Sequence, residues 1–254
     1  MNFFDNFTNY NLIAAHRGYS FKYPENSMIA FKKSIFKSDF IECDIRLTKD
    51  GIPIIFHDDD LYRTSNIREK KDLLKKGFLV KDFLYDELLE LDISSWFSSD
   101  ENFSIKYILS LDDILKFAIS NNIYLNLEIK DMSSIDYDFD ILVKILDIIE
   151  KNSCQNRVLI SSFNHNYLKR VKSINPIINI AALDYEVYSS SDILAYLKSL
   201  DVVSYHIDFS LVNKTLVNEL LENNIFTNVY TINDKSIRKD LFNIGIKSIF
   251  TDIL

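Results

Sequence analysis

Residues 40–58 read FIECDIRLTKDGIPIIFHD, and this stretch predicts a strand, a tight turn and a returning arm. The segment TKDG is typical of a hairpin turn, because it joins two apolar runs through Asp and Gly. Residues two apart on a strand point to the same face, so Glu42 and Asp44 are expected to project together. The hairpin returns its second arm beside the first, which places His57 near these two carboxylates.

Short apolar strands alternate with amphipathic helices along the rest of the chain. Strands are expected at residues 12–16, 40–47, 123–129, 158–162, 178–183, 202–207, 226–231 and 247–251, besides the hairpin arm at 52–57. Helices are expected at residues 25–37, 111–120, 139–150, 167–171, 192–197, 215–221 and 235–242. Eight strands with helical connections predict an α/β fold, the closed (β/α)8 TIM barrel. The alternative is an open doubly wound sheet, but no glycine-rich nucleotide turn follows the first strand.

One segment, residues 59–107, breaks this alternation, and we interpret it as a small inserted subdomain at the catalytic mouth. The whole of residues 1–254 is then expected to form a single barrel domain. The chain stops just after the last predicted strand, so the usual last helix is expected to be missing. Residues 2–11 or a partner chain are the candidates to cover its place.

The amino-acid composition and net charge of the chain argue against some classes of partner. The chain has 254 residues, of which 47% are hydrophobic, and its formal net charge is −8. An acidic chain without a basic stripe argues against nucleic acid and anionic membrane surfaces as partners. The first residues lack the pattern of a secretory signal, and no apolar run is long enough to span a membrane. We therefore expect a cytoplasmic protein with a small-molecule substrate and no stable membrane anchor, either as a monomer or as an oligomer.

Charged groups gather at the carboxyl ends of the predicted strands. In a barrel, these ends lie together at one mouth. Several charges pointing into a barrel would be costly unless a metal and hydrogen bonds compensated them, so incidental buried ion pairs are the weaker interpretation. Carboxylates from Glu42, Asp44 and Glu128 suit a hard divalent cation, Mg²⁺ or Ca²⁺. Two further sets complete the predicted site. Arg17 and Lys130 are candidate phosphate ligands, and His16 and His57 are candidate proton carriers whose acceptor and donor roles stay open.

The order of short motifs along the chain resembles the glycerophosphodiester phosphodiesterase family. The motifs are HRG at 16–18, PEN at 24–26, ECD at 42–44, TKDG at 48–51, FHD at 56–58, RTSN at 63–66, LDISSWF at 91–97, SLDDIL at 110–115, NLEIK at 126–130, SSF at 161–163, VYTIND at 229–234 and FTD at 250–252. The resemblance implies the barrel, the insertion, the metal ligands, the two acid–base histidines and the two phosphate contacts named above. It also implies hydrolysis of a glycerophosphodiester to sn-glycerol 3-phosphate and an alcohol, by attack of water or first of a glycerol hydroxyl.

A few positions depart from the family pattern and bear on substrate choice. Tyr230 stands where the family usually has Trp, on the wall that packs the glycerol or the leaving group. Trp96, the one tryptophan of the chain, lies in the insertion and is interpreted as part of an apolar lip for the substrate. A phospholipase D-like or lysophospholipid-cleaving enzyme on the same barrel is the first alternative, and a non-catalytic phosphodiester-binding protein is the second.

Overall fold

A closed barrel of parallel strands forms the centre of the computed structural model, which describes residues 1–97, 107–137, 140–185 and 190–254. The strands are β1 (Leu12–Ala15), β2 (Phe40–Leu47), β3 (Pro53–Ile55), β4 (Leu125–Ile129), β5 (Val158–Ser162), β6 (Asn179–Asp184), β7 (Ser204–Asp208), β8 (Phe226–Tyr230) and β9 (Ser248–Thr251). Their order in the sheet is β1-β9-β8-β7-β6-β5-β4-β2-β3, and β1 also pairs with β2. Every neighbouring pair in the closed ring is parallel, so the predicted (β/α)8 barrel is confirmed.

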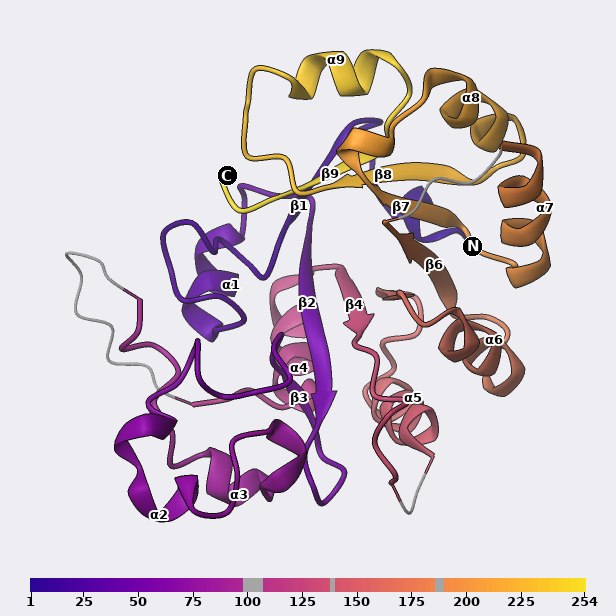
Figure 1. Ribbon diagram of the computed structural model, residues 1–254. Helices are drawn as coiled ribbons and strands as arrows, with labels where there is room; N and C mark the ends of the chain where they lie inside the picture. Colours follow the sequence, from indigo (N-terminus) through magenta and orange to yellow (C-terminus); the bar gives the residue numbers. More distant parts are fainter. Residues whose placement is uncertain (98–106, 138–139, 186–189) are drawn as a thin grey trace.

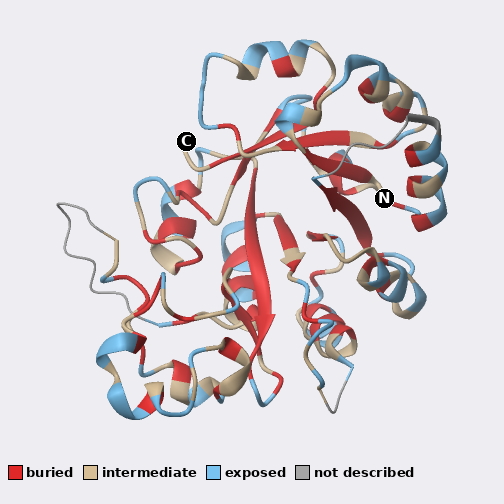
Figure 2. Cartoon of the chain, in the orientation of Figure 1, coloured by how far each residue is buried: buried red, intermediate tan, exposed pale blue. Residues whose placement is uncertain are grey.

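Helices surround the barrel and cover the outer face of its strands (Figure 1). The α-helices are α1 (Met28–Ser34), α2 (Lys71–Leu74), α3 (Tyr85–Leu88), α4 (Leu111–Asn121), α5 (Ile141–Lys151), α6 (His165–Ile174), α7 (Ser190–Leu200), α8 (Lys214–Glu222) and α9 (Arg238–Asn243). Short 3₁₀ helices lie at Phe3–Asn6, Ile67–Glu69, Val80–Asp82 and Phe209–Leu211. The strands are almost wholly buried while the helices expose one side (Figure 2), as expected for strands covered on both faces.

The first barrel helix begins later than its sequence pattern predicts. The expected start is residue 25, but α1 begins at Met28, because the Ser27 hydroxyl accepts a hydrogen bond from the Ala30 amide and so caps the helix. Pro24 therefore precedes the helix instead of opening it. The shift leaves Glu25 and Asn26 in the loop after β1, where their side chains reach the mouth of the barrel.

The hairpin and the inserted segment form a second packed cluster beside the barrel. β3 pairs antiparallel with β2, as predicted, with Ile45 and Ile55 as register partners. Ile54 and Phe56 of the returning arm pack against Leu61, Phe83 and other buried residues of the insertion. In Figure 1, α2 and α3 lie next to β3 and away from the other helices. Residues 98–106 of the predicted insertion lie outside the described residues.

The chain start packs across the amino-terminal ends of the strands. Phe3 and Phe4 are buried, and their rings contact Phe40 at the start of β2 and Phe226 at the start of β8. The expectation that residues 2–11 stand in for a last helix is therefore wrong for Phe3 and Phe4, which cover the floor of the barrel. Closure comes from backbone pairing between β1 and β9. Among the described residues, no helix combines the length and apolarity needed to cross a membrane.

Candidate active site

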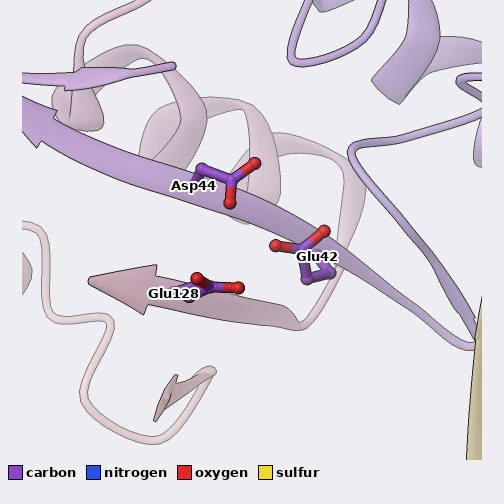
Figure 3. Close-up of side chains that lie close together, drawn as sticks. All are labelled: Glu42, Asp44 and Glu128. Carbon is purple, nitrogen blue, oxygen red and sulfur yellow. The ribbon is translucent and has the colours of Figure 1, made fainter. Parts of the chain in front are cut away.

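Three carboxylates from two neighbouring strands, β2 and β4, lie close together (Figure 3). Glu42 and Asp44 project from β2, and Glu128 projects from β4, where it is the register partner of Asp44. One oxygen of each residue lies within 4.8 Å of an oxygen of the other two. The Oε1 atom of Glu42 and the Oδ1 atom of Asp44 are buried without a hydrogen-bond partner. Buried acceptors need a partner, and the three carboxylates could supply the oxygen ligands of a divalent cation.

The pKa values of Glu42 and Asp44 are shifted in opposite directions. Burial, and then the charges of Asp44 and Glu128, raise the pKa of Glu42 well above its usual range, and Arg17 offsets this only in part. Burial also raises the pKa of Asp44, but Arg17 and its other cationic neighbours outweigh burial and lower that pKa to about 2. Without a metal, Glu42 is therefore the carboxylate that most readily takes a proton, while Asp44 stays ionised.

Cationic groups reach the cluster from two sides. Lys130, two residues after Glu128, donates to Glu128 Oε1 at 2.7 Å, and its Nζ atom lies 3.6 Å from Asp44 Oδ1. Arg17 follows β1, and its backbone amide donates to Glu42 Oε2 at 2.8 Å. Arg17 adopts a left-handed backbone conformation with φ of 54°, which turns this amide and the guanidinium toward the strands. The two predicted phosphate ligands therefore flank the carboxylates.

Tight packing fixes the turn that carries Arg17. The next residue, Gly18, has φ of 80°, a backbone conformation that residues other than glycine rarely adopt. A Cβ atom at this position would lie 2.8 Å from Ala30 and 2.9 Å from the Phe31 ring, so the turn lies directly against α1. The motif HRG thus needs its glycine for packing and its first two residues for the site.

His16 is held by a carboxylate from the last strand of the barrel. Its Nδ1 atom lies 2.7 Å from Asp252 Oδ1, immediately after β9. Asp252 also accepts hydrogen bonds from the Ser20 hydroxyl at 2.8 Å and from the Asn233 amide at 2.7 Å. Burial raises the pKa of Asp252, but these hydrogen bonds and the His16 imidazole hold it well below its usual range. With Nδ1 engaged by a carboxylate, Nε2 of His16 is the ring atom left for substrate.

His57, which also lines the site, has a matching arrangement. Its Nδ1 atom lies 2.6 Å from Oδ1 of the adjacent Asp58. Asp58 in turn accepts two hydrogen bonds from Arg63, at 2.7 and 2.9 Å. The same guanidinium donates to Glu25 at 2.7 Å through two nitrogens, and Glu25 also accepts from Arg17 at 2.8 Å. Each of the two imidazoles near the carboxylate cluster is thus held by its own aspartate.

A cavity of about 200 Å³ joins these groups. Its walls are His16, Arg17, Glu42, His57, Asn126, Glu128, Lys130, Phe163, Leu183, His206, Tyr230, Thr231 and Phe250. His206 is buried and hydrogen-bonded to Ser204 at 3.0 Å, and burial lowers its pKa to about 3, so it lines the cavity as a neutral imidazole. The cavity wall thus includes seven of the nine residues predicted for the site. The other two, Asp44 and Trp96, are not among its lining residues.

The two aromatic residues predicted to choose the substrate lie in different places. Tyr230 is on the cavity wall, with its hydroxyl donating to the Asp184 carbonyl at 2.7 Å and its ring 6.1 Å from that of Phe163. Trp96 is absent from the residues that line the cavity in the described part of the chain. Its ring centroid instead lies 5.9 Å from the Arg63 guanidinium, and its Nε1 donates to the Ile93 carbonyl.

Comparison with known proteins agrees with this geometry. Residues 16–254 match the Glycerophosphoryl diester phosphodiesterase family. The chain belongs to this family. Over 244 residues it is 35% identical to a glycerophosphodiester phosphodiesterase of Bacillus altitudinis, and the match covers 94% of each chain. A glycerophosphodiester phosphodiesterase of Caldanaerobacter subterraneus subsp. tengcongensis is 31% identical over 245 residues, which are 95% of this chain and 93% of that protein.

A solved structure gives the same assignment at the level of the fold. It is a phosphodiesterase of Oleispira antarctica in complex with the product sn-glycerol-3-phosphate, with a TM-score of 0.85 and 26% identity. The match covers 99% of this chain and 96% of the other. This glycerophosphodiester phosphodiesterase family member is thus an enzyme of the phosphodiesterase class on a TIM barrel.

Sequence reasoning gave no role to five polar residues that complete the site. These residues are Glu25, Asn26, Asp58, Arg63 and Asp252. All of them lie in loops, where no periodicity predicts the direction of a side chain. They do fall inside the motifs PEN, FHD, RTSN and FTD, so the motifs were the available signal. Asn26 is a clear example, because its amide donates to Asp44 Oδ2 at 2.8 Å, while Asp44 Oδ1 has no hydrogen-bond partner.

Proposed function

We propose that this family member is a metal-dependent glycerophosphodiesterase that releases sn-glycerol 3-phosphate and an alcohol. One observation carries the proposal: Glu42, Asp44 and Glu128 form a buried cluster in which Glu42 Oε1 and Asp44 Oδ1 lack a hydrogen-bond partner, and the adjoining cavity holds two imidazoles that are each fixed by an aspartate. A buried acidic cluster is suited to a divalent cation, and a pair of oriented imidazoles is suited to proton transfer.

Glu42, Asp44 and Glu128 would hold the cation, which we propose to be one Mg²⁺ or Ca²⁺ ion. Carboxylate oxygens without thiolate or imidazole ligands favour these hard cations over Zn²⁺. When bound, the ion would bind phosphoryl oxygens and offset the charge that develops on them. Arg17 and Lys130 lie beside the cluster, and their charges would hold the remaining phosphate oxygens.

His16 and His57 would divide the proton transfers between them. Each imidazole has Nδ1 against a carboxylate, at 2.7 Å from Asp252 and 2.6 Å from Asp58. This arrangement leaves Nε2 of both rings available to the substrate. One histidine would accept the proton of the attacking hydroxyl group and the other would protonate the leaving alkoxide. The attacking group is water or the glycerol hydroxyl next to the phosphate, and the second route passes through a cyclic phosphate.

A product assay on three substrate classes tests this proposal. The purified protein would be incubated with glycerophosphocholine, lysophosphatidylcholine and phosphatidylcholine in the presence of Mg²⁺ or Ca²⁺. We expect sn-glycerol 3-phosphate and choline from the first substrate and far slower cleavage of the two lipids. Faster cleavage of lysophosphatidylcholine or phosphatidylcholine would support the lysophospholipid-cleaving or phospholipase D-like alternative. Binding of glycerophosphocholine without any cleavage would support a non-catalytic binding protein.

A further inference from the structure

We infer that Arg63 is a positioning residue that ties His57 to Arg17 and so sets the two sides of the active site relative to each other. The inference rests on the proposed function, because it assigns His57 and Arg17 to the reaction. It concerns a residue of the inserted segment that does not line the catalytic cavity. Arg63 therefore acts through its neighbours and not on the substrate.

The Arg63 guanidinium forms a double fork. Toward Asp58 it donates from Nε at 2.7 Å and from Nη2 at 2.9 Å. Toward Glu25 it donates from Nη1 at 2.7 Å and from Nη2 at 2.7 Å. The guanidinium is planar, and each of two of its edges binds one carboxylate through a pair of hydrogen bonds. These two bidentate contacts fix the orientation of the guanidinium far more than a single ion pair does.

Each carboxylate of this fork has a second partner in the active site. Asp58 lies against Nδ1 of His57, and Glu25 accepts from Nη1 of Arg17 at 2.8 Å. The Nε atom of Arg17 lies 3.5 Å from Asp44 Oδ2. One chain of charged contacts therefore runs from the imidazole of His57 through Arg63 to the metal-site carboxylate Asp44. Its residues come from the loop after β1, from β2, from the end of the hairpin arm after β3 and from the start of the insertion.

The two imidazoles of the site differ in how their aspartates are held. Asp252 beside His16 is held by neutral donors, the hydroxyl of Ser20 and the amide of Asn233. Asp58 beside His57 is held by the Arg63 guanidinium, an exposed group whose side chain is 44% accessible. Without this guanidinium, Asp58 keeps His57 as its neighbour but loses its own fixed position. We therefore expect loss of Arg63 to disorder His57 and to leave His16 in place.

Lysine cannot replace arginine in this role. A lysine carries the same charge but a single nitrogen, so it cannot make paired contacts to two carboxylates at once. Arg63→Lys and Arg63→Gln should both lower kcat, by about tenfold to a hundredfold, the scale expected when a catalytic group is displaced by about 1 Å. Rescue of kcat by Arg63→Lys would show that charge alone matters and would overturn the inference.

A double-mutant cycle tests whether Arg63 acts through His57. The kcat of glycerophosphocholine hydrolysis would be measured for Arg63→Gln, His57→Ala and the double variant, with melting temperature and metal affinity measured for each. We expect Arg63→Gln to cost much less in the His57→Ala background than in wild type, because residues that act as a unit are not additive. Equal fold-losses in both backgrounds would overturn the inference. Arg68→Gln is the matched control, since Arg68 is an exposed arginine of the same segment that lies over the Tyr62 ring at 4.8 Å.

Amide hydrogen exchange tests whether Arg63 connects the two sides of the site, and this measurement does not depend on enzyme activity. In the intact protein, Arg63→Gln should speed amide exchange in peptides from residues 22–27 and 56–60, which carry the two carboxylates of the fork, while Arg68→Gln should leave both unchanged. Unchanged exchange at both sides in Arg63→Gln would contradict the inference. If wild type hydrolyses no glycerophosphodiester, the proposed function fails, and the exchange result still decides whether Arg63 connects the two sides.

Discussion

Asp44 and Glu128 are register partners on neighbouring parallel strands, and Lys130 reaches both of them. The Lys130 Nζ atom lies 2.7 Å from Glu128 and 3.6 Å from Asp44. The pairing of β2 with β4 thus brings the three proposed metal ligands and one proposed phosphate ligand together on the barrel wall. Since Glu42, Asp44 and Glu128 lie on strands and not on loops, backbone hydrogen bonds fix their spacing.

Metal binding should stabilise the protein more at alkaline than at acidic pH. The pKa of Glu42 is raised well above its usual range by burial and by its acidic neighbours. A raised folded-state pKa contributes stability below the unfolded value, and this contribution is lost as pH rises through the folded pKa. A divalent cation replaces that proton, so the rise in melting temperature on adding Mg²⁺ or Ca²⁺ should be larger at pH 8 than at pH 5.5. The pH difference should shrink in Glu42→Gln, and an equal rise at both pH values in wild type would contradict this prediction.

Loss of either site histidine should reduce rate without releasing the metal. General acid–base groups typically supply about a hundredfold to ten-thousandfold each. His16→Ala and His57→Ala should lose kcat on that scale while their metal affinity, measured by calorimetry, stays near that of wild type. His165→Gln is a matched control, because His165 bonds to Tyr196 and the Leu183 carbonyl and is absent from the cavity wall. Near wild-type turnover of His57→Ala would remove His57 from the mechanism.

Trp96→Ala should change substrate preference more than it changes the chemical step. The indole lies over the Arg63 guanidinium at 5.9 Å, at the edge of the inserted segment. Loops on the catalytic face of a barrel commonly set specificity while strand ends carry the reactive groups. We expect higher KM values or a new order of preference among glycerophosphodiesters with different head groups, from kcat/KM measured on each. An equal loss on every substrate through kcat alone would instead place Trp96 with Arg63 as a support of His57.

Acid should destabilise the barrel through His206. This imidazole is 1% exposed, and burial lowers its pKa to about 3, far below that of an unfolded chain. The unfolded state then binds the extra proton, so stability falls as pH drops below about 6.5, by about 1.4 kcal/mol per pH unit. His206→Gln should flatten this part of a urea-denaturation series between pH 6.5 and 4.5 relative to wild type. Parallel curves for the two proteins would show that His206 is protonated in the folded state.

The strands could be predicted from the sequence almost to the residue. Val158–Ser162 and Phe40–Leu47 were expected with the same bounds that β5 and β2 have. The first begins with a continuous apolar run, which is typical of a buried parallel strand. Helix starts were less accurate. Side-chain caps decide them, as Ser27 does for α1 and Asn164 does for α6, which begins at His165.

In the candidate site, too, the residues on strands could be predicted from the sequence and the residues in loops could not. Alternation along β2 and β4 predicted that Glu42, Asp44 and Glu128 share one face, and the structure brings them together. The carboxylates that hold the imidazoles, Asp58 and Asp252, come from loops at opposite ends of the chain. No local pattern joins residue 16 to residue 252, because that contact exists only once β9 pairs with β1 and closes the barrel.

Turnover and metal occupancy measured on the same samples test the central claim most directly. The protein would be stripped with excess chelator and then titrated with Mg²⁺ or Ca²⁺ while sn-glycerol 3-phosphate release from glycerophosphocholine is followed. The account predicts no turnover in chelator and a return of activity in step with the filling of one site per chain. It also predicts that Glu42→Gln requires far more metal for the same rate. Full turnover of wild type in excess chelator would contradict the account.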